Sequence, residues 1–287
     1  MATTPLGIAY DHVAHTNGIP IVLIHAGVAD RRMWDPQWEH LRTEHEIVRL
    51  DLRGFGESTA LPEGPLAHVD DVLSTLSHLG IGRCHLVGSS LGAGVACEVA
   101  LTAPHLVQSL LLCPPGGSLL AALTDDLKAF LDAERSALAV DDIDAAVEAN
   151  IAFWVVGPGR EASQVDLGIQ DFVRRMQRQA FEVTASWADV DEVELDPPVL
   201  EQLQDITVPT LVLIGGFDLT TTREAADQVC AGLTDVRRVD WPDVAHLPSL
   251  EQPDRFLTLL LGWIADHEAQ RPAAIPAERN SSNLAPE

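Results

Sequence analysis

Apolar residues follow two different spacings along this chain, and the two spacings alternate. Short runs rich in Val, Ile and Leu are typical of strands that are buried on both faces of a parallel sheet. Longer segments place apolar residues three and four positions apart, as amphipathic helices do. We expect strands at residues 21–24, 47–51, 85–87, 109–113, 210–214 and 236–239. The alternation predicts an α/β fold with a doubly wound, mostly parallel sheet.

Residues 116–205 interrupt this alternation, because they contain helical patterns and no convincing strand. Helices are expected at residues 125–138, 143–155 and 167–187, and a last amphipathic helix at 253–268. We therefore predict a core formed by residues 1–115 and 206–268, with residues 116–205 inserted as a helical lid. Apolar periodicity stops near residue 270, and Pro, Ala, Ser and Asn dominate the rest of the chain. Residues 269–287 are accordingly predicted to form a disordered tail.

A G-x-S-x-G motif lies where the strand at residues 85–87 gives way to a helix. It reads Gly88-Ser89-Ser90-Leu91-Gly92 and comes directly after an apolar run. A serine in so sharp a turn is crowded by the backbone, so the positions two before and two after it must lack side chains. The unpaired N–H groups and the positive dipole at the helix start favour an oxyanion beside Ser90. Ser90 is therefore the candidate nucleophile, and Ser89 is interpreted as a structural residue at the strand end.

A serine nucleophile needs a histidine base and a carboxylate that orients the histidine, and both are found downstream. Asp218 is the first ionisable residue beyond the strand at residues 210–214, at the sheet edge where the active sites of open parallel sheets lie. His246 lies in a loop just before the last helix. His25 is a rival base because it also follows a strand, and Asp243 is a rival acid because it is close to His246 in sequence. The strand that precedes the insertion runs into Pro-Pro-Gly-Gly and offers no carboxylate, which favours Asp218.

Four separated motifs give the chain a resemblance to enzymes of the α/β-hydrolase fold over nearly its whole length. They are Ile24-His25-Ala26-Gly27, Asp51-Leu52-Arg53-Gly54-Phe55-Gly56-Glu57-Ser58, the elbow around Ser90, and His246-Leu247-Pro248-Ser249-Leu250-Glu251-Gln252-Pro253. Within that superfamily the spacing is most similar to small-molecule esterases and lactonases of the 3-oxoadipate enol-lactonase type. Ala26 departs from the pattern, since relatives commonly have glycine there, and this puts in doubt only the detailed shape of the oxyanion loop.

The resemblance implies roles for the backbone beside the nucleophile. The N–H groups of Leu91 and Gly27 would form an oxyanion hole, with Val28 as the alternative second donor. His25 would brace the oxyanion turn as a structural histidine, which leaves His246 as the base. Asp243 is then interpreted as a turn residue.

Two apolar stripes in the insertion offer walls for a substrate pocket above the nucleophile. The candidate pocket residues are Phe153, Trp154, Phe172, Met176 and Trp187. The alternative interpretation is that each of them packs the insertion against the core. In the same way, Arg174, Arg175, Arg178 and the pair Arg31-Arg32 either hold a substrate carboxylate or balance nearby acids on a solvated face.

The chain is strongly acidic, with a formal net charge of −25 and 18 Lys and Arg in 287 residues. This charge argues against nucleic acid and anionic membrane surfaces as partners, because both would repel it. The N-terminus has neither a basic region nor an apolar stretch, and no segment approaches about 18 uninterrupted apolar residues, so we expect no signal peptide and no membrane span. The four cysteines lack metal-type spacing and are interpreted as reduced core residues of a cytoplasmic protein. No cofactor and no metal ion are expected.

We therefore expect a serine hydrolase that cleaves a small carboxylic ester or lactone, apolar or of mixed polarity, through an acyl-enzyme. Ser90 would attack the carbonyl carbon while His246 takes the proton and Asp218 orients the imidazole. One alternative uses the same triad for hydrolysis of a carbon–carbon bond or for a cofactor-free biosynthetic reaction. Another is a non-catalytic ligand-binding module on a hydrolase scaffold. The sequence leaves the substrate and the oligomeric state open.

Overall fold

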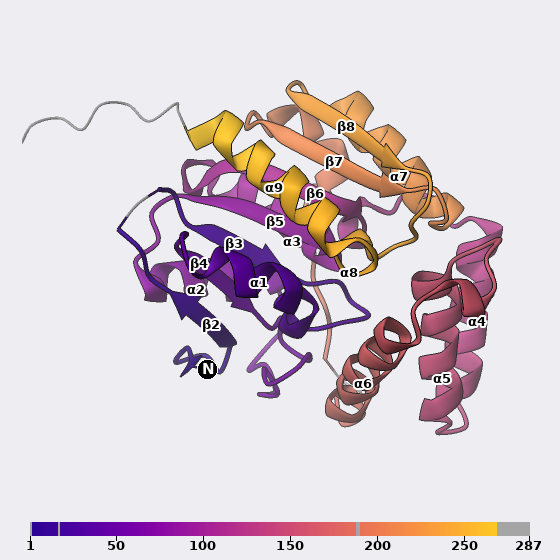
Figure 1. Cartoon of the computed structure of the whole chain (residues 1–287). Helices are drawn as coiled ribbons and strands as arrows, with labels where there is room; N and C mark the ends of the chain where they lie inside the picture. Colours follow the sequence, from indigo (N-terminus) through magenta and orange to yellow (C-terminus); the bar gives the residue numbers. More distant parts are fainter. Residues whose placement is uncertain (1, 17, 188–189, 269–287) are drawn as a thin grey trace, which may run out of the picture.

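A single eight-stranded sheet lies at the centre of the computed structural model, which describes residues 2–16, 18–187 and 190–268 (Figure 1). The strands are β1 (Ala2–Thr3), β2 (Ala9–Val13), β3 (Ile21–Ile24), β4 (Ile47–Leu50), β5 (Cys84–Ser90), β6 (Val107–Pro115), β7 (Thr210–Gly215) and β8 (Val236–Trp241). Their order is β1-β2-β4-β3-β5-β6-β7-β8. Neighbours from β4 to β8 in this order are parallel, whereas β2 is antiparallel to both β1 and β4. Ile24 lies opposite both Leu50 and Gly88, so β3, β4 and β5 reach the same edge of the sheet.

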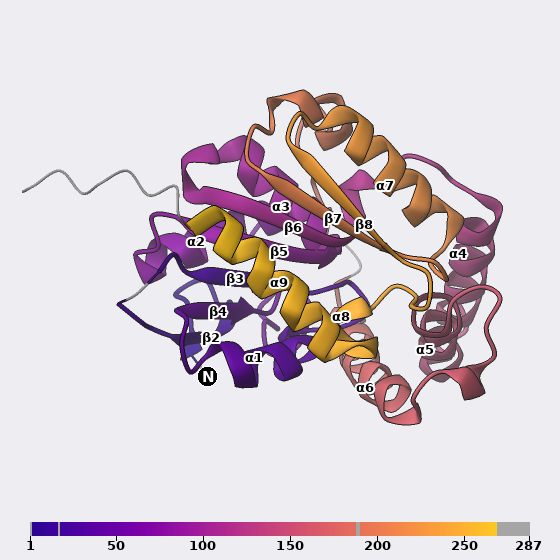
Figure 2. The same ribbon diagram turned by 45° about the horizontal axis from the view of Figure 1, so that its top comes forward.

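Helices cover both faces of the sheet (Figure 2). One face carries α1 (Asp35–Leu41) and α9 (Pro253–Glu268), with the short α8 (Pro248–Glu251) before α9; the other carries α2 (His68–Leu79), α3 (Leu91–Thr102) and α7 (Thr220–Gly232). Successive residues of β3 enter the two apolar clusters alternately: Ile21 and Leu23 join one cluster, and Val22 and Ile24 join the other. Because side chains of a strand alternate between faces, a strand covered on both sides reads as an unbroken apolar run.

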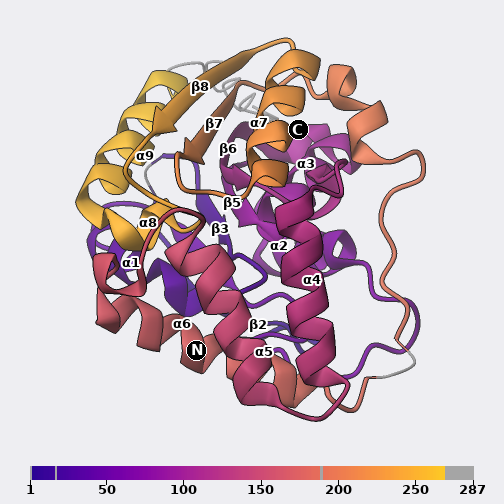
Figure 3. The same ribbon diagram turned by 90° about the vertical axis from the view of Figure 1, so that its right-hand side faces the viewer.

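The segment between β6 and β7 forms a separate group of helices beyond the carboxyl ends of the strands (Figure 3). It contains α4 (Asp125–Leu138), α5 (Ile143–Asn150), a turn of π-helix (Ile151–Val156) and α6 (Leu167–Thr184). Short 3-10 helices occur at Arg31–Trp34, Pro104–Leu106, Gly117–Leu119, Ala162–Gln164, Val199–Glu201 and Leu203–Asp205. The insertion therefore lies over the sheet edge at which β3, β4 and β5 end.

The sequence predicts the six parallel strands, β3 to β8, and the helices at 125–138 and 253–268 well, but three expectations need correction. It does not find β1 or β2, because β2 reads Ala-Tyr-Asp-His-Val and carries polar residues on a partly exposed strand near the sheet edge. The helix expected at 143–155 ends at Asn150 and continues as the π-helical turn. The helix expected at 167–187 ends at Thr184.

The tail predicted at 269–287 lies outside the described residues. Among the residues that the structure describes, no helix is long and apolar enough to cross a membrane.

Candidate active site

Ser90 is the last residue of β5 and has a backbone conformation that side chains rarely adopt, with φ of 54° and ψ of −114°. Its helix, α3, begins at the next residue, so the turn has no loop in which strain could relax. A Cβ atom added to Gly88 would meet the backbone of Gly92, and one added to Gly92 would lie 2.6 Å from the carbonyl oxygen of His25. These contacts explain why the positions two before and two after Ser90 are glycines.

A third glycine closes in on the nucleophile from the end of β6. A Cβ atom added to Gly116 would lie 2.8 Å from the Oγ of Ser90. Gly116 directly follows Pro115, which lies opposite Ser90 in the β5–β6 pairing. The sequence analysis used the Pro-Pro-Gly-Gly segment only to show that no carboxylate follows this strand. The pairing of β6 with β5 shows in addition that Gly116 lies against Ser90.

Asp218 and His246 lie in contact at the same sheet edge. The Nδ1 of His246 is 2.8 Å and 2.9 Å from the two carboxylate oxygens of Asp218, so the ring donates from Nδ1. Both side chains are buried, and the N–H of Leu219 donates a 2.8 Å hydrogen bond to Asp218. Asp218 follows β7, and His246 lies between β8 and α8. With Nδ1 held in this way, Nε2 is the ring nitrogen that can accept a proton.

The ring of His246 packs against a tryptophan of the insertion. The ring centroids of Trp154 and His246 are 4.4 Å apart and the rings are tilted by 49°. Trp154 lies in the π-helical turn, a local distortion that is frequent at functional sites. The imidazole of His246 therefore contacts both the carboxylate of Asp218 and the indole of Trp154.

Gly27 and Val28 line the same cavity as Ser90, on the loop after β3. Leu91 is the first residue of α3, and the N–H groups of a helix's first turn have no acceptor within the helix. A Cβ atom added to Gly27 would lie 3.6 Å from the Cβ of Leu91, so the loop and the helix start are close neighbours. The two segments predicted to supply oxyanion donors are therefore brought together.

His25 is buried and has both ring nitrogens occupied. Its Nδ1 donates to the carbonyl of Ala26 at 2.8 Å, and its Nε2 accepts from the N–H of Leu52 at 2.9 Å. Burial lowers the pKa of its imidazole. The rival base thus connects the loops after β3 and β4, and it has no nitrogen left for a proton from Ser90.

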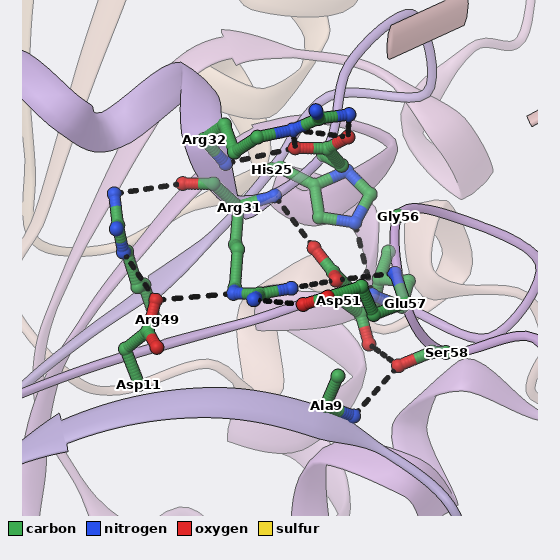
Figure 4. A network of polar contacts seen from close by, with 12 residues as sticks. Ala9, Asp11, His25, Arg31, Arg32, Arg49, Asp51, Gly56, Glu57 and Ser58 are labelled. Carbon is green, nitrogen blue, oxygen red and sulfur yellow. Dashed lines mark hydrogen bonds and ion pairs between the residues drawn. The ribbon is translucent and has the colours of Figure 1, made fainter. Parts of the chain in front are cut away.

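A network of charged side chains continues from this connection (Figure 4). Asp51 accepts hydrogen bonds of 2.8 Å from the N–H groups of Arg31 and Glu57, and it also pairs with the Arg31 guanidinium. Arg31 further pairs with Asp11 and Glu57. Ser58 donates 2.8 Å to the carbonyl of Asp51. These contacts fix the segment after the oxyanion loop to β4 and the loop beyond it.

Ser90 and His246 open into a cavity of about 300 Å³ beneath the insertion. It is lined by Gly27, Val28, Phe55, Ser90, Phe130, Glu134, Asn150, Trp154, Gln177, Ala180, Phe181, Thr184 and His246. A larger hollow of about 460 Å³ lies at the surface between the N-terminal turn and residues 60–71, and its described lining contains neither Ser90 nor His246. The smaller cavity is therefore the candidate substrate site.

Of the five predicted pocket residues, Trp154 alone is among the described residues that line this cavity. Phe153 packs against Phe130 at 5.7 Å between ring centroids, and Met176 is buried in the core cluster. Phe172 lies beneath the guanidinium of Arg175, and Trp187 lines a separate hollow with residues 61–64. Phe172, Met176 and Trp187 were predicted from one apolar stripe of the helix expected at 167–187. The cavity is instead lined by Gln177, Phe181 and Thr184, on a neighbouring face of α6.

Four of the five arginines have acidic partners, as their alternative interpretation expected, whereas the guanidinium of Arg175 lies over the ring of Phe172. Arg174 pairs with Glu148 and Asp171, and Arg178 pairs with Asp144. Arg32 pairs with Asp30 and also donates a hydrogen bond to Gln179. None of these arginines is among the described residues that line the Ser90 cavity.

The cysteines give the site no further chemistry. Cys84, Cys97 and Cys113 are fully buried, and burial raises the pKa of the Cys84 and Cys97 thiols to about 12. Over the described ranges, His, Cys, Asp and Glu side chains form no group of three or more that could hold a metal ion.

Comparison with known proteins agrees with this geometry. Residues 21–259 match the alpha/beta hydrolase family. A curated relative, 3-oxoadipate enol-lactonase 1 of Acinetobacter baylyi, is 23% identical over 86% of this chain and 89% of its own length; a provisionally named carbamate hydrolase of Pantoea ananatis is 27% identical over 85% and 87%. A solved structure of an esterase from Thermogutta terrifontis is 26% identical, with a TM-score of 0.70, and covers 91% of this chain and 94% of its own. With most of its length matched, the chain belongs to the alpha/beta hydrolase family.

Proposed function

We propose that this protein is a serine hydrolase that cleaves a small carboxylic ester or lactone through an acyl-enzyme. The observation that carries the proposal is the strained position of Ser90 in a cavity shared with His246, whose imidazole Asp218 holds by two short contacts. Relatives with lactonase and esterase names support this class of substrate.

The reaction follows from the positions of the groups. His246 Nε2 takes the Ser90 proton as Oγ attacks the substrate carbonyl carbon, and Asp218 stabilises the imidazolium that forms. The oxyanion is stabilised by the N–H of Leu91 and by one from the Gly27–Val28 segment, each worth about 10²–10³ in turnover. The imidazolium then protonates the leaving alcohol, and His246 activates a water molecule that hydrolyses the acyl-enzyme.

The helices α4, α5 and α6 are proposed to act as the lid of this cavity. Seven of the lining residues, from Phe130 to Thr184, belong to these helices, and Trp154 belongs to the turn after α5. A cavity of about 300 Å³ is at the small end of ligand pockets, which suits a compact ester or lactone.

Covalent labelling tests the proposal directly. We expect a fluorophosphonate to add once to the wild-type protein, as seen by intact mass, and not to Ser90→Ala or His246→Ala. Asp218→Asn should lower kcat toward p-nitrophenyl esters by about 10⁴, because the imidazole loses the partner that fixes its tautomer. Circular dichroism of each variant checks that the fold is retained.

The two alternatives give different results in the same experiments. A carbon–carbon hydrolase or a cofactor-free biosynthetic enzyme would be labelled at Ser90 yet leave a panel of simple esters and lactones intact. A ligand-binding module would show neither labelling nor turnover while folded, and that outcome would contradict the proposal.

A further inference from the structure

Besides Thr184, three polar side chains of the insertion line the Ser90 cavity, each from a different helix. Glu134 comes from α4, Asn150 from the end of α5, and Gln177 from α6. Around them the lining includes the aromatic rings of Phe130, Trp154 and Phe181. Polar groups in such surroundings cost free energy unless they are paired, so their arrangement carries information about what they bind.

Asn150 is buried and both of its amide N–H groups are used. They donate to the carboxylate of Glu134 at 2.6 Å and to the carbonyl of Ala146 at 3.0 Å. The amide therefore holds the carboxylate at the cavity. Burial raises the pKa of Glu134, which indicates that water hydrates this carboxylate incompletely.

Gln177 is 5% exposed, and within the described chain its Oε1 has no hydrogen-bond partner. A buried side-chain oxygen without a partner is rare in folded proteins, and such a group is costly unless a ligand or water pairs with it. Glu134 therefore offers the cavity a carboxylate, and the unpaired Oε1 of Gln177 becomes an acceptor for a ligand once its side chain rotates toward the cavity. The donors of Asn150, by contrast, are already engaged.

The charges of the lining residues also favour a ligand that donates hydrogen bonds. Glu134 is the one carboxylate and no lysine or arginine occurs among the described residues around the cavity. A substrate carboxylate placed here would meet a like charge without a compensating cation. A hydroxyl or an ammonium group would instead donate hydrogen bonds to these acceptors, and hydrogen bonds to a charged group are the stronger kind.

We propose that Glu134, Asn150 and Gln177 form an acceptor site for the part of the substrate remote from the scissile bond, and that the substrate carries a hydrogen-bond donor there, a hydroxyl or an ammonium group, and no carboxylate. The assignment of this ligand to an ester or lactone rests on the proposed function. The binding preference itself does not depend on turnover.

The test measures binding first. Hexylammonium, 1-hexanol and hexanoate have the same chain length and differ in their polar end, and their affinities are compared by titration calorimetry at neutral pH. We expect hexylammonium to bind about tenfold or more tightly than hexanoate, with hexanol between them. In Glu134→Gln, which keeps an acceptor for Asn150 and removes the charge, the ratio should fall by about tenfold. Gln177→Met should weaken hexanol and hexylammonium alike.

Asp132→Asn is the matched control, because Asp132 is exposed on the same helix and its loss changes the net charge equally. Its affinities should match the wild type, which separates a local contact from the field of an acidic protein. Equal affinity for hexylammonium and hexanoate would overturn the inference. So would a preference that survives Glu134→Gln, or the failure of all three ligands to bind.

Turnover separates this inference from the proposed function. Wild-type protein is assayed with p-nitrophenyl hexanoate, 6-hydroxyhexanoate, 6-aminohexanoate and the adipate monoester. Ser90-dependent hydrolysis at equal kcat/KM for all four would sustain the hydrolase and refute the acceptor site. A binding order that follows the inference, without any hydrolysis, would refute the hydrolase and sustain the acceptor site.

Discussion

Gln179, in α6, donates a hydrogen bond of 2.7 Å to the carbonyl of Gly56, in the loop after β4. Its side-chain oxygen accepts a 2.8 Å hydrogen bond from the guanidinium of Arg32, which follows the oxyanion loop. One side chain of the insertion therefore joins the two loops that His25 connects from beneath. The position of α6 above the cavity is set in part by this residue.

Gln179→Leu should lower kcat/KM for an ester substrate by about three- to tenfold, because two hydrogen bonds that position α6 are lost together. Gln179→Glu keeps an acceptor for Arg32 and loses the donor to Gly56, so its kcat/KM should lie between those of Gln179→Leu and the wild type. Glu182→Gln, exposed on the same helix, is the control and should have no effect. An unchanged kcat/KM in Gln179→Leu would show that other contacts suffice to hold the helix.

Asp51→Asn should lower the free energy of unfolding by about 2–4 kcal/mol, because the buried Arg31 loses a charged partner. The exposed pair of Asp243 and Arg255, at 3.0 Å, provides the comparison. Asp243→Asn should cost less than about 1 kcal/mol. Urea unfolding of the two variants measures both values, and similar losses would contradict the assignment of Asp51 as the buried anchor of the loop.

Gly92→Ala should destabilise the fold by more than about 3 kcal/mol or prevent folding, because its Cβ would approach the carbonyls of Ile24 and His25 to less than 3.0 Å. Gly262→Ala is the opposite case, since Gly262 lies in α9 and nothing is within 4 Å of an added Cβ. That change should stabilise the protein by about 0.5–1 kcal/mol. Thermal unfolding compares the two, and a mild effect at Gly92 would mean that the elbow can widen.

Glu98, in α3, shares a small hollow with Glu192 and Glu194. Burial, with these like charges, raises the pKa of the Glu98 carboxyl from 4.5 to about 7. As pH rises, the unfolded chain therefore loses this proton first, and the contribution of Glu98 to stability falls between pH 4.5 and about 7 and then stays level. Relative to wild type, Glu98→Gln should gain about 1–3 kcal/mol across that window.

Chemical denaturation at pH 5 and pH 8 measures this gain. Glu224→Gln, exposed on α7, serves as the control for removing one negative charge from the acidic surface. A gain of equal size in both variants would attribute the effect to net charge and not to the burial of Glu98.

The nucleophile turn was accessible to sequence reasoning because its constraints are local. Gly88 and Gly92 are fixed by contacts within two residues of Ser90 along the chain or with the adjacent strand. Asp218 and His246 could be placed at the site because each follows a strand, and the carboxyl ends of parallel strands share one edge. The central strands were recognised for a similar reason, since burial on both faces leaves an apolar run.

The roof of the cavity was not accessible in this way. Whether a polar residue of an amphipathic helix faces solvent or a cavity depends on how that helix packs against others. Glu134 and Gln177 look like solvated positions in the sequence, and it is the packing of α4, α5 and α6 that makes them line the Ser90 cavity. Trp187 was placed wrongly because α6 ends three residues before it.

The polar roof of the cavity comes from one uninterrupted stretch of chain between β6 and β7, while the three groups proposed to do the chemistry come from outside it. On these proposals, the polar groups that select the substrate and the groups that cleave its bond lie in different parts of the sequence. Exchanging residues 116–205 for the same segment of a relative should give the chimaera the relative's substrate range, while Ser90, Asp218 and His246 stay unchanged.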